Sequence, residues 1–202
     1  MKKILVSLLS VFCFASFAVA GDWGAGVKLG VGENDPKSLN EAFDYYGGKL
    51  TEGNGIFGLE VFYEWNLNDD VNKLGWKVGL DVYGENEWKA YPYKITETIY
   101  AFPITFYYKQ DYGVKNWSWF AGAGISFMKG EAEDGPATYK DSQVFPHITA
   151  GAEYRFTEVF ALGLEAKYNI NAELKEHIPG TYYYYTTDRS GISAALTGRF
   201  YF

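Results

Sequence analysis

The residues best suited to chemistry are two histidines, each with an acidic residue at a short spacing. His147 stands two residues before Thr149 and six before Glu153, so alternation along a strand would place all three on one face. Glu173 and His177 are four residues apart, which would place two metal ligands on one face of a helix. A hydrolase needs a nucleophile within reach of its base, yet neither serine nor cysteine stands beside His147. Two ligands are too few for a metal centre. The sequence therefore predicts no enzyme, no metal and no cofactor.

The segment around His147 is one of several in which apolar and polar residues alternate along the chain. This period of two is typical of β-strands with one apolar face. In the final strand Ile192, Leu196 and Phe200 share one face with small residues, and Arg199 lies on the other. One face of every such segment carries no charge, although 21% of the residues are charged. A charge facing hydrocarbon costs a few kcal/mol near the midplane, so this pattern favours strands in a bilayer. The eight segments are approximately 22–32, 56–67, 73–83, 98–109, 116–128, 144–156, 158–170 and 192–202.

The first twenty residues are set aside as a cleaved secretory signal. Lys2 and Lys3 form a basic region, an apolar run follows, and Ala18-Val19-Ala20 is a typical cleavage site. Cys13, the single cysteine, lies within this segment. Cleavage leaves 182 residues with a net charge of −9, because two lysines are lost from a total of −7. We expect a signal peptide at 1–20 and one barrel domain at 21–202, and the acidic balance argues against nucleic acid as a partner.

Connections of two lengths alternate between the strands. Three are short, at 66–72, 110–115 and 157–158, and four are long. The long ones are at about 33–55, 84–97, 129–143 and 171–189. This is the order of an up-and-down barrel with short periplasmic turns and long extracellular loops. In the first long loop, Asp35-Pro36 and Ser38 to Glu41 predict a cap for one or two helical turns that end at Gly47-Gly48. Pro103 lies within the fourth strand, where proline is normally unfavourable.

The charged strand faces are nearly balanced, with six basic and five acidic residues. An eight-stranded barrel is only wide enough to be filled by side chains, and buried charges persist there when they are paired. We therefore predict an internal network that plugs the lumen, although a narrow ion path is an alternative. Its members are Lys28, Glu60, Glu64, Lys77, Asp81, Lys109, His147, Glu153, Arg155, Glu165, Lys167 and Arg199.

The four long loops are the candidate contact surface. Together they carry a net charge of −7, which suits a solvated face and could also attract divalent cations or a basic partner. The last loop contains Tyr182, Tyr183, Tyr184 and Tyr185 in succession. Such a run could extend a strand beyond the membrane or form an adhesive surface, since tyrosine is enriched at interfaces.

The chain resembles the small outer-membrane barrels of the OmpA, OmpX and opacity-protein type. The resemblance is carried by Gly122-Ala-Gly124, by the segments 146–156 and 162–168, and by the terminal Phe200-Tyr201-Phe202. It implies that Phe200 and Phe202 act as an assembly signal read by the barrel-assembly machinery. Thr197 and Ala195 depart from the usual pattern of that signal. Some barrels of this size are lipid-modifying enzymes, including a deacylase that uses Ser, His and an acidic residue.

The sequence as a whole predicts an all-β protein, an eight-stranded antiparallel up-and-down transmembrane β-barrel in the outer membrane of a Gram-negative-type bacterium. Its expected role is non-enzymatic, in envelope integrity or surface interaction through the loops, with membrane lipid and the assembly machinery as partners. Two alternatives remain. A lipocalin-like periplasmic protein would turn the apolar face inward around an apolar ligand. A narrow channel would conduct small solutes through the lumen.

Overall fold

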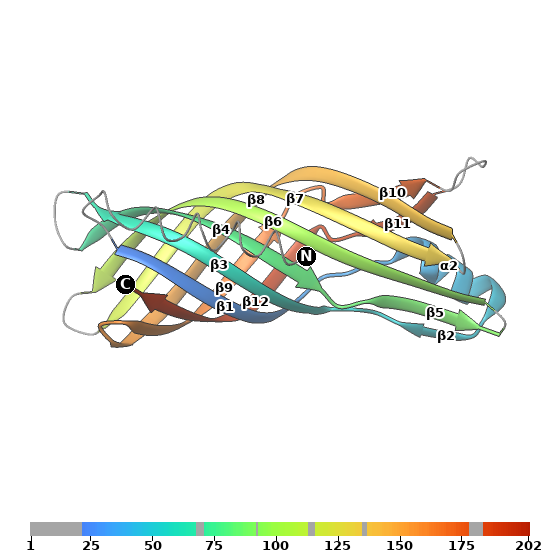
Figure 1. The fold of residues 1–202 in the computed structure, drawn as a ribbon, viewed down its shortest axis with the longest axis horizontal. Helices are drawn as coiled ribbons and strands as arrows, with labels where there is room; N and C mark the ends of the chain where they lie inside the picture. Colours follow the sequence, from blue (N-terminus) through green and yellow to red (C-terminus); the bar gives the residue numbers. More distant parts are fainter. Residues whose placement is uncertain (1–21, 68–70, 92, 113–115, 135–136, 178–183) are drawn as a thin grey trace, which may run out of the picture.

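Eight long strands form one closed antiparallel ring (Figure 1). The computed structural model describes residues 22–67, 71–91, 93–112, 116–134, 137–177 and 184–202, so the predicted signal segment lies outside the described residues. In chain order the ring strands are β1 (Asp22–Gly32), β3 (Gly55–Asn66), β4 (Asn72–Tyr83), β6 (Tyr93–Tyr112), β7 (Trp117–Asp134), β8 (Ala137–Thr157), β9 (Phe160–Asn169) and β12 (Gly191–Tyr201).

Pairing of the first and last strands closes the ring. Each of these strands pairs with the next in the series, and β1 pairs with β12 from Gly24 opposite Tyr201 to Gly32 opposite Ser193. Every ring strand thereby gains two hydrogen-bonded neighbours, which removes the unpaired edges that lipid could not satisfy. The predicted eight-stranded antiparallel barrel is confirmed. Within the described ranges, no helix has both the length and the apolar character needed to cross a membrane.

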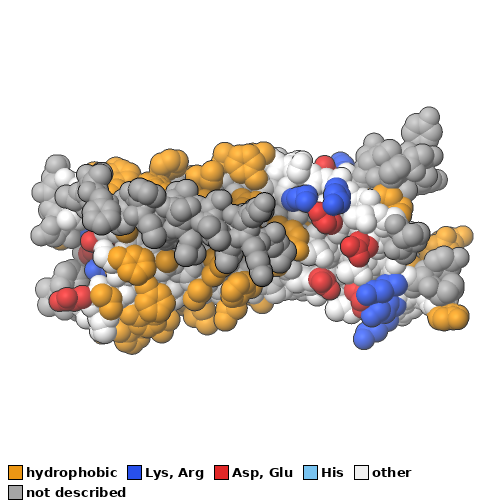
Figure 2. Space-filling model, in the orientation of Figure 1, with side chains coloured by type: hydrophobic (Ala, Val, Ile, Leu, Met, Phe, Trp, Pro, Cys, Tyr) orange, Lys and Arg blue, Asp and Glu red, His pale blue; other side chains and the backbone are white. Residues whose placement is uncertain are grey.

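The charge-free faces of the strands point outward and form an apolar belt (Figure 2). Leu164 on β9 and Leu196 on β12 are directly opposed and are 64% and 63% exposed. Burying such side chains against hydrocarbon is favourable, whereas water would leave a large exposed apolar surface. The lipocalin-like alternative is therefore wrong, because the apolar face does not line a cavity. The belt includes Val27, Leu29, Phe57, Leu59, Phe102, Phe106, Ile125, Phe127, Val144, Ile148, Leu162, Leu164, Tyr168, Ile192, Leu196 and Phe200.

Three ring strands run well past their predicted ends. Strands β6, β7 and β8 stay paired as far as Ile95 opposite Asp134 and Asp134 opposite Ala137. Much of the predicted loops 84–97 and 129–143 is thus strand, and that part of the prediction is wrong. The charges that suggested a loop lie on the outer face, where Lys129 bonds Glu131 at 2.5 Å, while Ala132 is buried. These charges mark the end of the apolar belt, beyond which the strands continue.

The other two long loops also contain regular structure. The first holds helix α2 (Lys37–Tyr46) and strand β2 (Lys49–Thr51), and the last holds β10 (Glu173–His177) and β11 (Tyr184–Asp188). Strand β5 (Asn86–Ala90) joins β2 to the edge of β6. All of these elements lie at one end of the molecule, away from the short turns (Figure 1). The three short connections lie where they are predicted, and the first and last long connections are present, but only two residues separate the ends of β7 and β8.

Helix α2 forms where the sequence predicts it, but its start differs. Its N-cap is Pro36, without a side-chain cap, and the predicted capping by Ser38 does not occur at the helix start. Instead the Ser38 hydroxyl accepts a hydrogen bond from the Thr186 backbone N–H of β11 at 2.8 Å. The helix ends at Gly47, whose φ of 70° is readily adopted by glycine.

An ion-pair strap fastens α2 to the hairpin of β10 and β11. Lys37 Nζ lies 2.8 Å from Glu173 and 3.4 Å from Asp188. The hydrogen bond from Lys37 lowers the pKa of the Glu173 carboxyl and raises that of the lysine. The ion pairs therefore hold together two segments that are far apart in the sequence, at the end of the molecule away from the short turns.

Pro103 is accommodated by a local gap in the pairing of β6 with β4. The register runs from Asp81 opposite Ala101 to Val78 opposite Ile104, and the two intervening pairs are missing. A side chain at Gly79 would approach the Pro103 ring to 3.3 Å, so the glycine leaves it room. On the other side, Pro103 pairs normally with Ser126 of β7. A proline therefore fits a central strand here because only one of its two ladders is interrupted.

Because the apolar belt is assigned to lipid, we predict that Leu164→Arg prevents insertion into the membrane. A cation facing the bilayer midplane costs about 2–4 kcal/mol. The measurement is the heat-dependent gel shift of the outer-membrane fraction. The matched control is Thr138→Arg, which lies on an exposed position of β8 beyond the belt. It should keep the shift of the unmodified protein. Normal insertion of Leu164→Arg would contradict the assignment of the lipid face.

Candidate functional site

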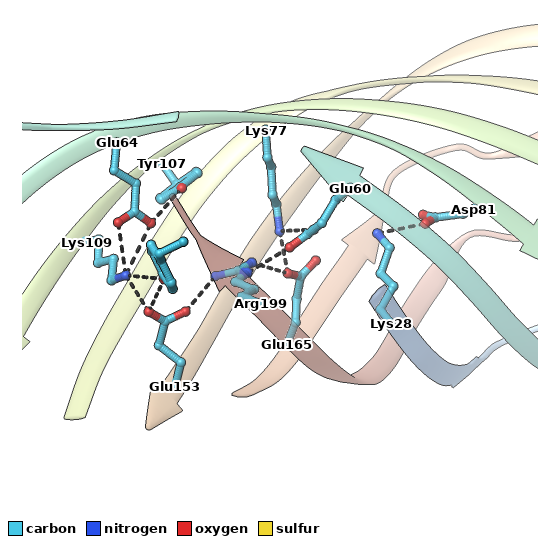
Figure 3. Close-up of polar contacts among 11 residues, drawn as sticks. Lys28, Glu60, Glu64, Lys77, Asp81, Tyr107, Lys109, Glu153, Glu165 and Arg199 are labelled. Atoms are coloured by element: carbon cyan, nitrogen blue, oxygen red, sulfur yellow. Dashed lines mark hydrogen bonds and ion pairs between the residues drawn. The ribbon is translucent and has the colours of Figure 1, made fainter. Parts of the chain in front are cut away.

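The barrel interior holds paired charges in two neighbouring groups (Figure 3). Arg199, on β12, lies at its centre and is 1% exposed. Its guanidinium bonds Glu60 at 2.7 Å and Glu153 at 2.9 Å, and a third carboxylate, Glu165, lies at 3.4 Å. The same guanidinium lies over the ring of Phe120 at 4.8 Å. Three strands of the wall are thus tied to β12 through one side chain.

Lys109 organises the part of the interior toward the short turns. Its ammonium lies 3.1 Å from Glu64, bonds Glu153 and donates to the Tyr201 hydroxyl at 2.9 Å. That hydroxyl donates in turn to Glu153 at 2.6 Å, and the Tyr107 hydroxyl donates to Glu64 at 2.9 Å. Charge-assisted hydrogen bonds of this kind are the stronger ones in proteins. Each buried carboxylate in this part therefore has a cation and a hydroxyl as partners.

Asp81 organises the part of the interior toward the end opposite the short turns. Lys28 and Lys167 lie 2.7 Å and 2.8 Å from its two oxygens. Lys77 belongs to the central group, because it bonds Glu165 and lies 3.7 Å from Glu60. A small cavity lined by Lys28, Lys77, Glu165 and Lys167 borders both groups. Five cations and five carboxylates are ion-paired across the interior: Lys28, Lys77, Lys109, Lys167 and Arg199 with Glu60, Glu64, Asp81, Glu153 and Glu165.

Two residues predicted for this network take other partners. Arg155 makes no ion pair with a described carboxylate, and its guanidinium instead lies 4.1 Å from the centre of the Tyr201 ring. His147 is 1% exposed and bonds the hydroxyl of Thr105 at 2.9 Å and that of Ser126 at 3.0 Å. Both side chains face the interior, as the alternating strand pattern predicts. Their partners could not be predicted from that pattern.

The expectation that no serine stands beside His147 is wrong. Ser126 lies on β7, two residues after Gly124, and Gly124 pairs directly with His147 of β8. Ser126 and His147 are therefore diagonal neighbours on adjacent strands. This cross-strand contact cannot be read from spacing along one strand. The pair nevertheless lacks the third member of a hydrolytic triad, because a threonine hydroxyl, not a carboxylate, meets the second ring nitrogen. Ser126 is also fully buried.

An apolar layer lies above the charges in the interior, and it is not among the features predicted from the sequence. Its residues continue the inward faces of the strands into segments predicted as loops, so extending the alternation would have found them. They are Ile56, Tyr83, Ile99, Ala101, Met128, Phe145, Ala172 and Leu174, and each is at most 7% exposed.

Polar contacts at the barrel mouth join this layer to the first long loop. Arg189 is buried, donates to the Gly53 carbonyl at 3.0 Å and lies over the Tyr83 ring at 4.7 Å. Asn86 accepts from the Gly53 N–H at 2.8 Å and donates to Glu97 at 2.5 Å. At the opposite end Lys73, also missed, bonds Asp22 and Asp111 at 3.0 and 3.3 Å.

The remaining predicted site residues lie on the outside or beyond the described parts. Phe200 and Phe202 are 48% and 78% exposed on the outer face, and the Phe202 N–H donates to the Trp23 carbonyl at 2.8 Å. Tyr182 and Tyr183 lie outside the described residues. Tyr184 and Tyr185 belong to β11, where only their backbone placement is described.

Glu173 and His177 do not share a helix, because both lie in strand β10. That expectation is wrong, and the strand follows from the pairing of this segment with β11. The Glu173 carboxylate is occupied by Lys37 and Lys175, at 2.8 and 3.0 Å. In the described part of the chain, no three His, Cys, Asp or Glu side chains gather as a metal site would require.

Several known structures have a similar barrel fold. Ail, the attachment invasion locus protein of Yersinia pestis, has a TM-score of 0.56 at 9% identity over 91% of this chain and 99% of its own. Neisserial surface protein A has a TM-score of 0.53 at 14% identity, over 90% of this chain and 98% of its own. The N-terminal barrel domain of Pseudomonas aeruginosa OprF scores 0.50 at 11% identity, over 91% and 100%. At such identities the likeness shows the fold alone. No match to this sequence was found among curated proteins.

The family comparison agrees with the geometry. Residues 4–200 match the family model described as outer membrane protein beta-barrel domain. The match covers nearly the whole chain, and the outward apolar belt and inward charges are what that family requires. The chain belongs to the outer membrane protein β-barrel domain family and is a protein of the outer membrane.

Proposed function

We propose that this protein is a closed, non-enzymatic barrel that acts in surface interaction or envelope integrity through its extracellular elements. The observation that carries the proposal is the set of ten ion-paired charges in the interior, which lie beneath an apolar layer. The strands and α2 beyond the belt then offer the accessible surface. Ail is named for attachment and invasion, and we extend attachment, as a proposal, to this chain.

Closure is supported by the small space that the side chains leave. The interior cavity bounded by Lys28, Glu165 and Pro103 has a volume of about 10 Å³. That is close to the space needed by a single water molecule. A hydrated ion would have to break several buried ion pairs to pass, and removing one partner of such a pair typically costs about 3–5 kcal/mol.

Assembly and lipid contact complete the proposal. Phe200 and Phe202 are exposed at the end of β12, and the ring of Phe200 lies 5.1 Å from that of Phe160. A terminal aromatic pair on the outer face is accessible to the barrel-assembly machinery before insertion. Afterwards the same rings meet lipid together with the rest of the belt.

Closure predicts that the purified protein produces no conductance steps in a planar lipid bilayer. The measurement uses protein whose heat-dependent gel shift confirms folding, with a known porin as the positive control. Steady, reproducible steps from the folded protein would favour the narrow-channel alternative and contradict the proposal.

The buried Ser126–His147 pair allows a direct test of the non-enzymatic assignment. We expect no hydrolysis of lipid A or of a soluble ester, since the serine is fully buried and the histidine lacks a carboxylate partner. The test compares the unmodified protein with Ser126→Ala and with Ser118→Ala, another buried serine of β7. Activity that is lost in Ser126→Ala and kept in Ser118→Ala would show that the pair is catalytic.

A further inference from the structure

Four large aromatic side chains stand exposed at the end of the molecule farthest from the short turns. Phe43, Tyr45 and Tyr46 belong to the last turns of α2, and Tyr91 lies in the turn between β5 and β6. They are 40%, 82%, 71% and 102% exposed, and together we call them the aromatic tip. Hydrophobic side chains at this end are separated from the belt by a zone of charged residues (Figure 2).

The fold brings the two segments of the aromatic tip together. β2 pairs with β5, with Lys49 opposite Lys89, and so places the end of α2 beside the β5–β6 turn. Gly48 permits the close approach, because a side chain there would meet the Lys89 carbonyl at 2.3 Å. Its φ of 104° is also one that only glycine adopts without strain. The tip is thus one surface built from two loops.

The exposed rings rest on a buried support. Tyr45 packs edge-on against Tyr46 with ring centres 4.7 Å apart, and Tyr46 lies 6.3 Å from Trp88. Trp88 is 5% exposed, packs with Leu39 and donates to the Gly47 carbonyl at 2.8 Å. Side chains held in this way lose little conformational entropy on binding, which is a property of good binding surfaces.

The aromatic tip does not belong to the membrane interface of its own barrel. Tyr100 on β6 is among the last outward-facing aromatics of that strand near the belt, and β6 continues for seven residues to Tyr93. At about 3.3 Å per residue the strand rises roughly 23 Å over that distance. Ion pairs of Glu131 with Lys129 and Lys140 occupy the outer surface in between. The exposed rings therefore need another explanation.

Charge around the aromatic tip favours a cation. Glu41 and Asp44 are exposed on α2, in the same segment as three of the rings, and neither forms an ion pair within the described residues. Of the nearby lysines, Lys89 and Lys94 both bind Glu87, at 2.5 and 2.9 Å, whereas Lys49 is exposed and makes no ion pair within the described residues. Two carboxylates without an ion pair therefore stand against one such lysine, which leaves an excess of negative charge. Other extracellular lysines that are held by carboxylates are Lys37, Lys129, Lys140 and Lys175.

We propose that the aromatic tip, with Glu41 and Asp44, binds an arginine- or lysine-rich segment of a partner protein. Cations are attracted to the faces of tyrosine rings, and the carboxylates add charge-assisted hydrogen bonds. Tyrosine and arginine are also enriched where interfaces carry most of their binding energy. This inference rests on the proposed surface-interaction function and names the chemistry of its partner.

The test uses the full chain in lipid nanodiscs and a fluorescent peptide of arginine-glycine-serine repeats, followed by anisotropy. Tyr45→Ala and Tyr91→Ala come from different loops, and each should weaken binding about tenfold. The matched control is Tyr112→Ala, an exposed tyrosine at the short-turn end, which should leave binding unchanged. Glu41→Gln should weaken binding more than Glu158→Gln, an equal loss of charge at the short-turn end.

If the tip variants and the control variants lose the same amount of peptide affinity, the binding is general electrostatic attraction, and the inference is overturned. Binding of neutral glycans or of zwitterionic vesicles through the same tyrosines, without binding of the peptide, would also overturn it. Adhesion of cells that express the protein separates the two proposals. If adhesion requires the protein but is unchanged in Tyr45→Ala and Tyr91→Ala, the surface function stands and the aromatic tip is not its site.

Discussion

A lipid bilayer offers no partner to a charge or to an unpaired backbone N–H, and the whole structure follows from that constraint. Backbone pairing must close on itself, which it does between β1 and β12. Side chains on the outer face must be uncharged where they meet lipid, so the charges of the strands within the apolar belt turn inward. The interior of eight strands is too narrow to hydrate these charges, and they must therefore satisfy one another.

Arg199 shows how the constraint is met. A guanidinium presents several donors in a fixed plane, and here it serves three carboxylates on three other strands while two aromatic rings flank it. The network therefore ties strands of the wall to one another across the interior. The elements beyond the belt lie outside this network.

The sequence predicts the barrel well because one physical rule, the exclusion of charge from lipid, acts on every strand. It predicts the inward direction of Arg155 and His147 for the same reason. Their partners could not be predicted, because Ser126 and Tyr201 reach them across strands whose register no single strand reveals. The extended strands were missed because charge on the outer face marks the limit of the bilayer, not the end of pairing. The aromatic tip depends on the contact between two loops and on the turn at Gly48, which alternation does not encode.

The central claim is that the paired interior holds the barrel together, and the free energy of unfolding of Arg199→Met in detergent micelles tests it most directly. The substitution keeps an unbranched apolar stem but removes the guanidinium, which leaves three buried carboxylates without their shared cation. We predict a loss of about 3–5 kcal/mol, as for other buried ion pairs that lose one partner. Lys129→Met, which removes an exposed ion pair with Glu131, should cost less than about 1 kcal/mol. Equal and small losses in both variants would contradict the account.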